Sequence, residues 1–527
     1  MLALMMVTIV VAGLYLRLEG LFSHVTYIDE ILLLSQGQLV PSDTEIAEIS
    51  KTSLSKYVES TVSATTNSYA PLPVALVRLF HGPQMFSIEA LRGLRSLSVI
   101  FSFLSLLLFA HLTYLYSGRK ITSGGLWVLT LFACQMIQWG NAKQGHTYSA
   151  GVCGVLVVLE LLEWIQRSPS LVSIGFFIFG SIVAMSLQYQ VLVWVLSVST
   201  MGFFSFRGGK NECTASVRGR SLIRLGFLAI GLFSLIGIAC LSHFKAKLMV
   251  PYWVVGFMVP RSSWWAGLKA LCLNLFEIST LMHLTYQRGE NLLLSWVGLV
   301  LVLIGIAVAL RTNKCFEIRD FLGPKSSVLF LGIWVLAFLM GKTPMSPTRH
   351  AMVYMVPLLI LEMLGLHWLI QKLSRWPWEQ FLVGGALIIL SLTLVNFPKY
   401  LRASRETFDS TKLERWIHEY NTQKLATWTY DFSKLKLFSR NSKERKEYYW
   451  AWPGHLEMLP KEPLLFIEAN CHAGTLSQKL ISSSSEFSFK KVYEAQELFD
   501  FEPMEEVSYA SNVFRVWVLT PKDPGKG

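Results

Sequence analysis

The sequence predicts a mainly α, polytopic membrane protein of about 11 transmembrane helices, followed by a small soluble α/β domain. Of the 527 residues, 52% are hydrophobic and only 16% are charged, whereas soluble domains carry about 25% charged residues. The apolar residues also occur in separate runs, most of them near the length that crosses a bilayer. A third observation, the return to mixed composition after Pro398, predicts the soluble domain.

The apolar runs define the predicted spans. They lie near residues 1–16, 97–116, 123–137, 149–165, 171–187, 190–206, 224–242, 291–310, 327–341, 351–369 and 379–397. The first run lacks a small-residue cleavage site, so we expect it to be retained as a membrane helix and not removed as a signal peptide.

Basic residues gather in every second loop between these spans, which predicts the orientation of the chain. The basic loops contain Arg119-Lys120, Arg167, Arg207 to Arg224, Arg311 to Lys325, and Lys372 with Arg375. Short loops rich in Lys and Arg stay in the cytoplasm. The other loops, which include the short loop with Lys143 and the segments near residues 17–96, 243–290 and 341–350, and the C-terminal domain are therefore expected on the outer face. The sequence has no Asn-x-Ser/Thr site, which favours a bacterial cytoplasmic membrane.

The net charge of +12 does not indicate nucleic-acid binding. Residues 398–527 carry 19 basic and 18 acidic residues, so almost all of the excess lies between or beside the apolar spans. This distribution is typical of cytoplasmic anchoring at a membrane. No Cys-x-x-Cys spacing occurs among the seven cysteines, so neither a disulfide framework nor a zinc site is indicated.

The outer segments and the C-terminal part have distinct characters. Residues 17–96 are too many for a simple connector. Residues 243–290 are rich in Trp, including Trp253, Trp264 and Trp265, and are expected to lie in the membrane interface. In the domain over 398–527, we expect a helix over Thr411–Lys424, another near Thr475–Ile481, and strands over Leu464–Glu468 and Phe514–Leu519.

Two adjacent carboxylates, Asp29 and Glu30, follow the first span. A carboxylate at a membrane boundary faces water, a partner or a site, because facing lipid costs free energy. On a helix, neighbouring side chains point about 100° apart, so both cannot reach one substrate atom. Either one works while the other braces it, or the pair only begins a solvated loop.

Five short motifs occur in order between residues 10 and 370. They are Arg17 followed by Asp29-Glu30, Tyr69-Ala70-Pro71-Leu72, Leu91-Arg92-Gly93-Leu94-Arg95-Ser96, Asn141-Ala142-Lys143-Gln144-Gly145-His146-Thr147-Tyr148, and Thr348-Arg349-His350 through Pro357. Together the series resembles the membrane glycosyltransferases of the GT-C class, the group of the protein O-mannosyltransferases and the lipid A aminoarabinose transferase. Each motif is weak alone, and their order and shared sidedness carry the resemblance.

The resemblance implies a sugar donor linked through phosphate to a polyprenyl chain, and a lipid, glycan or protein acceptor. Transfer with inversion needs a base for the acceptor hydroxyl and positive groups for the departing phosphate. The resemblance implies that Asp29 is this base, with Glu30 beside it. The residues expected at the lipid phosphate are Arg349, Arg92 or Arg95, Lys143 and His146. Gln144 stands where many relatives have an acid, so metal dependence stays open.

Two other functions are compatible with a polytopic chain. A polysaccharide polymerase or ligase also has many spans, but its charged sites tend to lie in later outer loops. A lipid or solute transporter would place charged residues deep within spans, and Glu160, Glu163 and Glu362 fall inside predicted spans.

Overall fold

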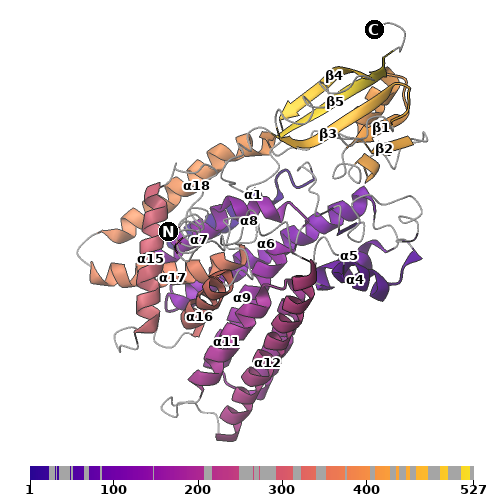
Figure 1. Cartoon of the computed structure of the whole chain (residues 1–527). Helices are drawn as coiled ribbons and strands as arrows, with labels where there is room; N and C mark the ends of the chain where they lie inside the picture. Colours follow the sequence, from indigo (N-terminus) through magenta and orange to yellow (C-terminus); the bar gives the residue numbers. More distant parts are fainter. Residues whose placement is uncertain are drawn as a thin grey trace.

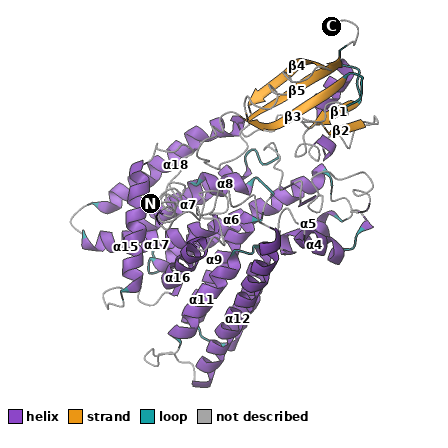
Figure 2. Cartoon of the chain, viewed as in Figure 1, coloured by secondary structure: helices purple, strands orange, loops and turns teal. Residues whose placement is uncertain are grey.

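The computed structural model describes residues 1–22, 30, 33–34, 48, 51–63, 71–82, 86–145, 147–206, 217–248, 265, 272, 292–311, 322–339, 352–373, 377–403, 410–427, 435–437, 447–450, 459–472, 487–496 and 512–522. Within these ranges the chain consists of a helical part and a C-terminal sheet (Figures 1 and 2). The predicted fold class is confirmed.

The helices coincide with all of the predicted spans. They are α1 (Leu2–Leu18), α4 (Leu54–Ser63), α5 (Pro71–His81), α6 (Ile88–Tyr116), α7 (Ser123–Cys134), α8 (Met136–Ala142), α9 (Tyr148–Arg167), α10 (Leu171–Leu187), α11 (Val191–Ser205), α12 (Val217–Leu248), α15 (Leu292–Leu310), α16 (Leu322–Leu339), α17 (Met352–Lys372), α18 (Trp378–Ala403) and α19 (Ser410–Glu419).

Among the described residues, 6 segments are long and apolar enough to cross a membrane. They are Ile88–Tyr116, Tyr148–Arg167, Gly219–Cys240, Leu322–Leu339, Met352–Lys372 and Trp378–Pro398. The chain is therefore a multi-pass membrane protein. The apolar helices α1, α7, α10 and α11 have at most 17 residues. At 1.5 Å per residue they are shorter than the ~30 Å hydrocarbon layer.

Helices α15 and α17 pack backbone against backbone, because a glycine from each lies at the crossing. A Cβ atom on Gly305 would lie 1.9 Å from the carbonyl oxygen of Leu361, and one on Gly365 would lie 2.0 Å from that of Leu301. Small residues at a crossing let membrane helices approach closely, so dispersion contacts can hold them together where lipid provides no hydrophobic drive.

The α7–α8 pair is one apolar run interrupted at Gln135, which has φ −58° and ψ 118° and so leaves the helical conformation. A break releases backbone carbonyl groups that must find other donors. Two side chains supply them. The indole Nε1 of Trp139 donates to the carbonyl of Cys134 at 3.0 Å, and Nη1 of Arg17 donates to that of Ala133 at 3.2 Å.

The C-terminal part is a five-stranded sheet covered on one face by α19. Its strands are β1 (Lys424–Thr427), β2 (Glu447–Trp450), β3 (Leu464–His472), β4 (Phe487–Gln496) and β5 (Asn512–Pro521), in the order β2-β1-β3-β5-β4. β1 is parallel to β2 and β3, and β5 is antiparallel to β3 and β4. Alternate residues of β3 and β5 face the two cores of the sheet, as a period of two requires.

The predicted strands over Leu464–Glu468 and Phe514–Leu519 lie within β3 and β5. The helix predicted over Thr411–Lys424 is wrong at its end, because α19 stops at Glu419 and Lys424 already begins β1. Asn421 explains the stop, since its φ of 44° is left-handed, a conformation that ends helices and that Asn tolerates. The helix predicted near Thr475–Ile481 lies outside the described residues.

The C-terminal domain packs on the segment between α1 and α6. Leu435 belongs to the core beneath α19, and Leu437 belongs to a second core that contains Leu33, Leu34 and Tyr57. Ile88, the first residue of α6, also packs against the core beneath α19. Figure 1 shows the sheet at the end of the molecule that carries α4 and α5, with α18 leading toward it.

Candidate functional site

A buried ion pair joins Glu30 to Arg95 near the start of α6. Nε of Arg95 donates to Oε1 of Glu30 at 2.8 Å, and Nη2 donates to Oε2 at 2.9 Å. The pair is bidentate, the arrangement that the planar guanidinium favours with carboxylates. Both side chains are almost fully buried, so removing either charge would leave the other unpaired, at a cost of about 3–5 kcal/mol.

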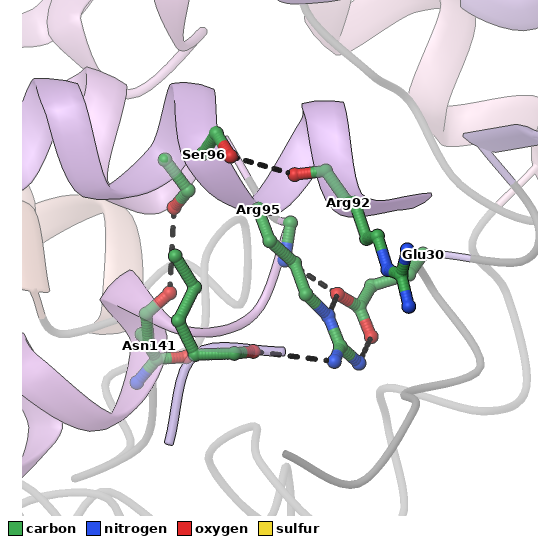
Figure 3. Close-up of polar contacts among 8 residues, drawn as sticks. Glu30, Arg92, Arg95, Ser96 and Asn141 are labelled. Carbon is green, nitrogen blue, oxygen red and sulfur yellow. Dashed lines mark hydrogen bonds and ion pairs between the residues drawn. The ribbon is translucent and has the colours of Figure 1, made fainter. Parts of the chain in front are cut away.

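A third segment joins the same carboxylate. The backbone N–H of Gly145 donates to Oε1 of Glu30 at 2.6 Å, and Nη1 of Arg95 reaches the carbonyl of Leu21 at 3.4 Å. Glu30 thus connects the segment after α1, the first turns of α6 and the connection between α8 and α9 (Figure 3). These segments are 65 and 115 residues apart in sequence.

The close approach at Gly145 depends on its missing side chain. A Cβ atom there would lie 2.4 Å from Cγ of Leu94 and 2.7 Å from its Cδ2. Leu94, a residue of α6, is itself buried in the core that this helix forms with the segment between α1 and α6, so it has little room to move. Gly145, the glycine of the fourth motif, is therefore required by the packing around Glu30 and Arg95.

Arg92 and Arg95 differ in their environments, although both lie on one side of α6. Residues three apart on a helix share a face, and Figure 3 shows both side chains extending from the same side of the helix. Arg95 is buried against Glu30, whereas Arg92 is exposed. Of the two arginines predicted at a phosphate, Arg92 is thus the accessible one.

Arg17 is fully buried at the end of α1 and links three helices. Its Nε donates to Oγ of Ser102 in α6 at 2.8 Å, and its Nη1 donates to the carbonyls of Gly13 and Ala133. By capping the end of α7, its positive charge also meets the negative end of that helix dipole. Nη2 has no hydrogen-bond partner among the residues that the structure describes.

Lys143 follows α8 and is fully buried between aromatic rings. Its Nζ lies 4.3 Å from the ring centre of Phe397 and 5.2 Å from that of Trp139, within cation–π range. Burial lowers the pKa of Lys143 to about 7, with the charge of Glu19 raising it and that of Arg17 lowering it. The buried side chains of Arg17 and Lys143 are therefore close enough for their positive charges to repel each other.

The start of α17 adjoins the same region. Nε2 of Gln138 in α8 donates to Sδ of Met355 at 3.6 Å. A Cβ atom on Gly151, early in α9, would lie 3.2 Å from Cγ2 of Val353. The helix that follows the Thr348-Arg349-His350 motif thus begins beside the segment that carries Lys143 and Gly145.

The structure brings together Glu30, Arg95 and Gly145, and places Lys143 two residues from that cluster in sequence. Asp29, His146 and Arg349 lie outside the described residues, as do residues 341–350 and most of 243–290. Sequence reasoning gave no role to Trp139 or Phe397. No sequence signal marks them, because their importance comes from contact with Lys143.

The sequence did not decide whether the protein binds a metal ion, and that question depends on Gln144. Within the described ranges, no group of three His, Cys, Asp or Glu side chains could hold a metal ion. Gln144 is buried, and its Oε1 has no hydrogen-bond partner among the described residues. An amide oxygen is a weak single ligand, so the residues described do not by themselves form a metal centre.

No protein-family model matches the chain, and no curated protein matches it. Among solved structures, the chain is similar to the crystal structure of ArnT from Cupriavidus metallidurans in the apo state. The identity is 11%, the match covers 97% of each chain, and the TM-score is 0.36. The superposition is too loose to transfer any residue's role from ArnT to this chain.

Proposed function

We propose that the chain is a GT-C-class membrane glycosyltransferase. It would move a sugar from a polyprenyl-phosphate donor to a lipid, glycan or protein acceptor at the outer face of a bacterial cytoplasmic membrane. One observation carries the proposal. Three motifs far apart in sequence, those with Asp29-Glu30, Arg95 and Gly145, converge on a single hydrogen-bonded cluster at the end of the membrane helices.

In this proposal Asp29 accepts the proton of the acceptor hydroxyl as its oxygen attacks the anomeric carbon of the sugar. The bond between that carbon and the phosphate oxygen breaks on the opposite face, which inverts the configuration. The leaving phosphate needs positive charge but no general acid, because it is already a weak base. Arg92, Lys143, His146 and Arg349 would supply that charge.

Glu30 has the supporting role in this scheme. Its two oxygens already accept hydrogen bonds from Arg95 and Gly145, so it is poorly placed to accept a substrate proton. Because Asp29 is its neighbour in the chain, fixing Glu30 restricts the segment that carries the proposed base. Arg95 serves the same anchoring purpose, which leaves Arg92 as the arginine of that motif available to a phosphate.

The test uses purified protein in liposomes with a panel of polyprenyl-phosphate sugars and membrane extract as acceptor. Mass spectrometry would measure freed polyprenyl phosphate. We expect release by the unaltered chain and a loss of about 100-fold or more in Asp29→Asn, as for removal of a general base. Glu59→Gln, which changes an exposed carboxylate of α4, should keep full activity.

Equal activity in Asp29→Asn would overturn the base assignment. If no donor released polyprenyl phosphate with acceptor present, the proposed transferase function would be overturned.

A transporter is the second candidate, favoured by buried carboxylates inside the helical part. Glu362 in α17 is fully buried, and Glu163 in α9 accepts a hydrogen bond from the hydroxyl of Tyr116 at 3.0 Å. Intramembrane carboxylates often mark ion or solute pathways. In the same liposomes, a transporter would move labelled lipid or solute across the bilayer without breaking the sugar–phosphate bond.

A further inference from the structure

Two buried contacts hold the segment that begins at the second residue of the acidic pair. Glu30 accepts hydrogen bonds from Arg95 and Gly145. Three residues later, the carbonyl of Leu33 accepts a hydrogen bond from the hydroxyl of Tyr57 in α4 at 2.9 Å. The side chains of Leu33 and Tyr57 are both buried in the core that this segment forms with α5 and α6. Polar contacts therefore fix the segment at Glu30 and again at Leu33.

Tyr57 in turn lies beneath the guanidinium of Arg78, a buried residue of α5. Cζ of Arg78 is 5.2 Å from the ring centre of Tyr57, within cation–π range. Nη1 of Arg78 donates to the carbonyl of Gly82 at 2.6 Å, and Nη2 donates to that of Thr52 at 2.6 Å. Thr52 precedes α4 and Gly82 follows α5, so one guanidinium connects the ends of both helices. The rigid fork of arginine suits this arrangement, whereas the single ammonium of lysine cannot reach both carbonyls with the same geometry.

The end of α5 also packs against α6. Figure 1 shows α4 and α5 together near the start of α6. The imidazole of His81, the last residue of α5, fills the space beside Gly93, where an added Cβ atom would lie 1.7 Å from its Nε2. Gly93 lies between Arg92 and Arg95 in the third motif. Helices α4 and α5 thus contact both parts of the candidate site, the acidic segment through Tyr57 and the arginine motif through His81.

We propose that Tyr57 and Arg78 are positioning residues for the sugar transfer. Arg78 holds the ring of Tyr57, and Tyr57 holds the segment that begins at Glu30, the neighbour of the proposed base Asp29. This inference rests on the proposed function. A base acts on the reacting proton in the transition state, so its displacement lowers kcat and leaves the binding of the donor unchanged. A displacement of about 1 Å can lower the rate about 100-fold.

The first measurement is hydrogen–deuterium exchange of the purified full chain in detergent, read by mass spectrometry in the peptide that contains residues 30–34. Tyr57→Phe removes the hydroxyl that bonds Leu33 and keeps the ring beneath Arg78. We expect exchange in that peptide to become about fivefold faster, as for the loss of one net hydrogen bond. Exchange in α9 should not change. Arg78→Lys should have the same effect, because it releases the ring of Tyr57.

The second measurement is the release of polyprenyl phosphate in liposomes, analysed as kcat and KM for the donor. Tyr57→Phe and Arg78→Lys should each lower kcat about tenfold or more and leave KM within about twofold of the unaltered chain. Tyr449→Phe is the matched control. It also removes a hydroxyl hydrogen bond, that to Glu447 at 2.8 Å, but in the C-terminal sheet. It should change neither kcat nor the exchange in residues 30–34.

Unchanged exchange in Tyr57→Phe and Arg78→Lys would overturn the proposal, and so would faster exchange with an unchanged kcat. A lower melting temperature with kcat and KM both unchanged would show a role in stability alone and would equally contradict it. If Tyr57→Phe does not fold, Arg78→Lys decides. The exchange measurement needs no substrate. If no donor releases polyprenyl phosphate, the proposed function fails and the role in catalysis with it, while exchange still decides whether Tyr57 and Arg78 hold the segment.

Discussion

Near the candidate site, the pKa of Lys143 depends strongly on the burial of its side chain. Its pKa falls from 10.5 to about 7 because burial disfavours the ammonium form. In the unfolded chain the same group would stay protonated up to its ordinary pKa. Between pH 7 and 10.5 the unfolded state therefore binds more protons, and the contribution of Lys143 to the free energy of unfolding rises with pH.

We expect this pH dependence to appear in the difference in melting temperature between the unaltered chain and the Lys143→Met variant. The methionine keeps the apolar stem but has no charge to desolvate, so its advantage in melting temperature should be largest near pH 6.5 and shrink by pH 10. Scanning fluorimetry in detergent across this range measures it. A difference that does not vary with pH would contradict a buried, depressed Lys143. Lys120→Met, at an exposed position, is the control.

The acidic pair shows what sequence could predict about single residues. The helical angle between neighbours left two alternatives: one carboxylate works and the other braces it, or the pair only begins a solvated loop. Glu30 accepts hydrogen bonds from Arg95 and Gly145, and the roles of Asp29 and Glu30 stay predictions. The sequence could not choose between Arg92 and Arg95, because residues three apart share a helix face. Burial against Glu30, which separates them, depends on segments far away in the chain.

Among the helices, the contact between α15 and α17 should be the least tolerant of added volume. The atoms that a new Cβ would meet at Gly305 and Gly365 are backbone oxygens and carbons, which cannot rotate away as a side chain can. Gly305→Ala and Gly365→Ala must therefore separate the two helices. We expect each to destabilise the protein by about 1–3 kcal/mol or more, the usual range for overpacking.

The matched controls are glycines in open surroundings. Gly332→Ala in α16 and Gly384→Ala in α18 would meet no atom within 4 Å, and alanine favours helix by up to about 1 kcal/mol. Their melting temperatures should stay the same or rise, whereas those of the two crossing variants should fall. If all four behave alike, the crossing is looser than described.

The helices themselves were predictable, but their lengths and breaks were not. Apolar runs are read directly from composition, and every predicted run is helical. The break at Gln135 has no glycine or proline to announce it. It depends on Trp139 and Arg17, which take up the released carbonyl groups. The helix predicted to reach Lys424 failed for a similar local reason, since Asn421 turns the chain after Glu419.

On the scale of the whole molecule, residues 435–437 connect the C-terminal domain to the segment between α1 and α6. Leu437 fills the core around Tyr57, and Leu435 fills the core beneath α19. We expect Leu437→Asp to loosen this attachment, because an unpaired carboxylate in an apolar core is strongly unfavourable. Limited proteolysis should then cut between α18 and the sheet at lower protease concentration.

Leu373→Asp, at an exposed position beyond α17, is the control for this change. Unaltered proteolysis in Leu437→Asp would mean that the two cores do not depend on each other. The sequence predicted a separate C-terminal domain. It could not predict the docking, because a contact between distant apolar residues has no period or spacing by which to recognise it.

Arg17 also has a consequence for how the chain enters the membrane. It is the sole basic residue of α1 and lies at the helix end expected on the outer face, so by the positive-inside rule α1 alone would insert the other way round. Its partners Ser102 and Ala133 are synthesised 85 and 116 residues later. Arg119 and Lys120 follow α6 and, by the same rule, favour the orientation of α6 that lets Ser102 pair with Arg17. We therefore expect α1 to take its final orientation from helices that are synthesised after it.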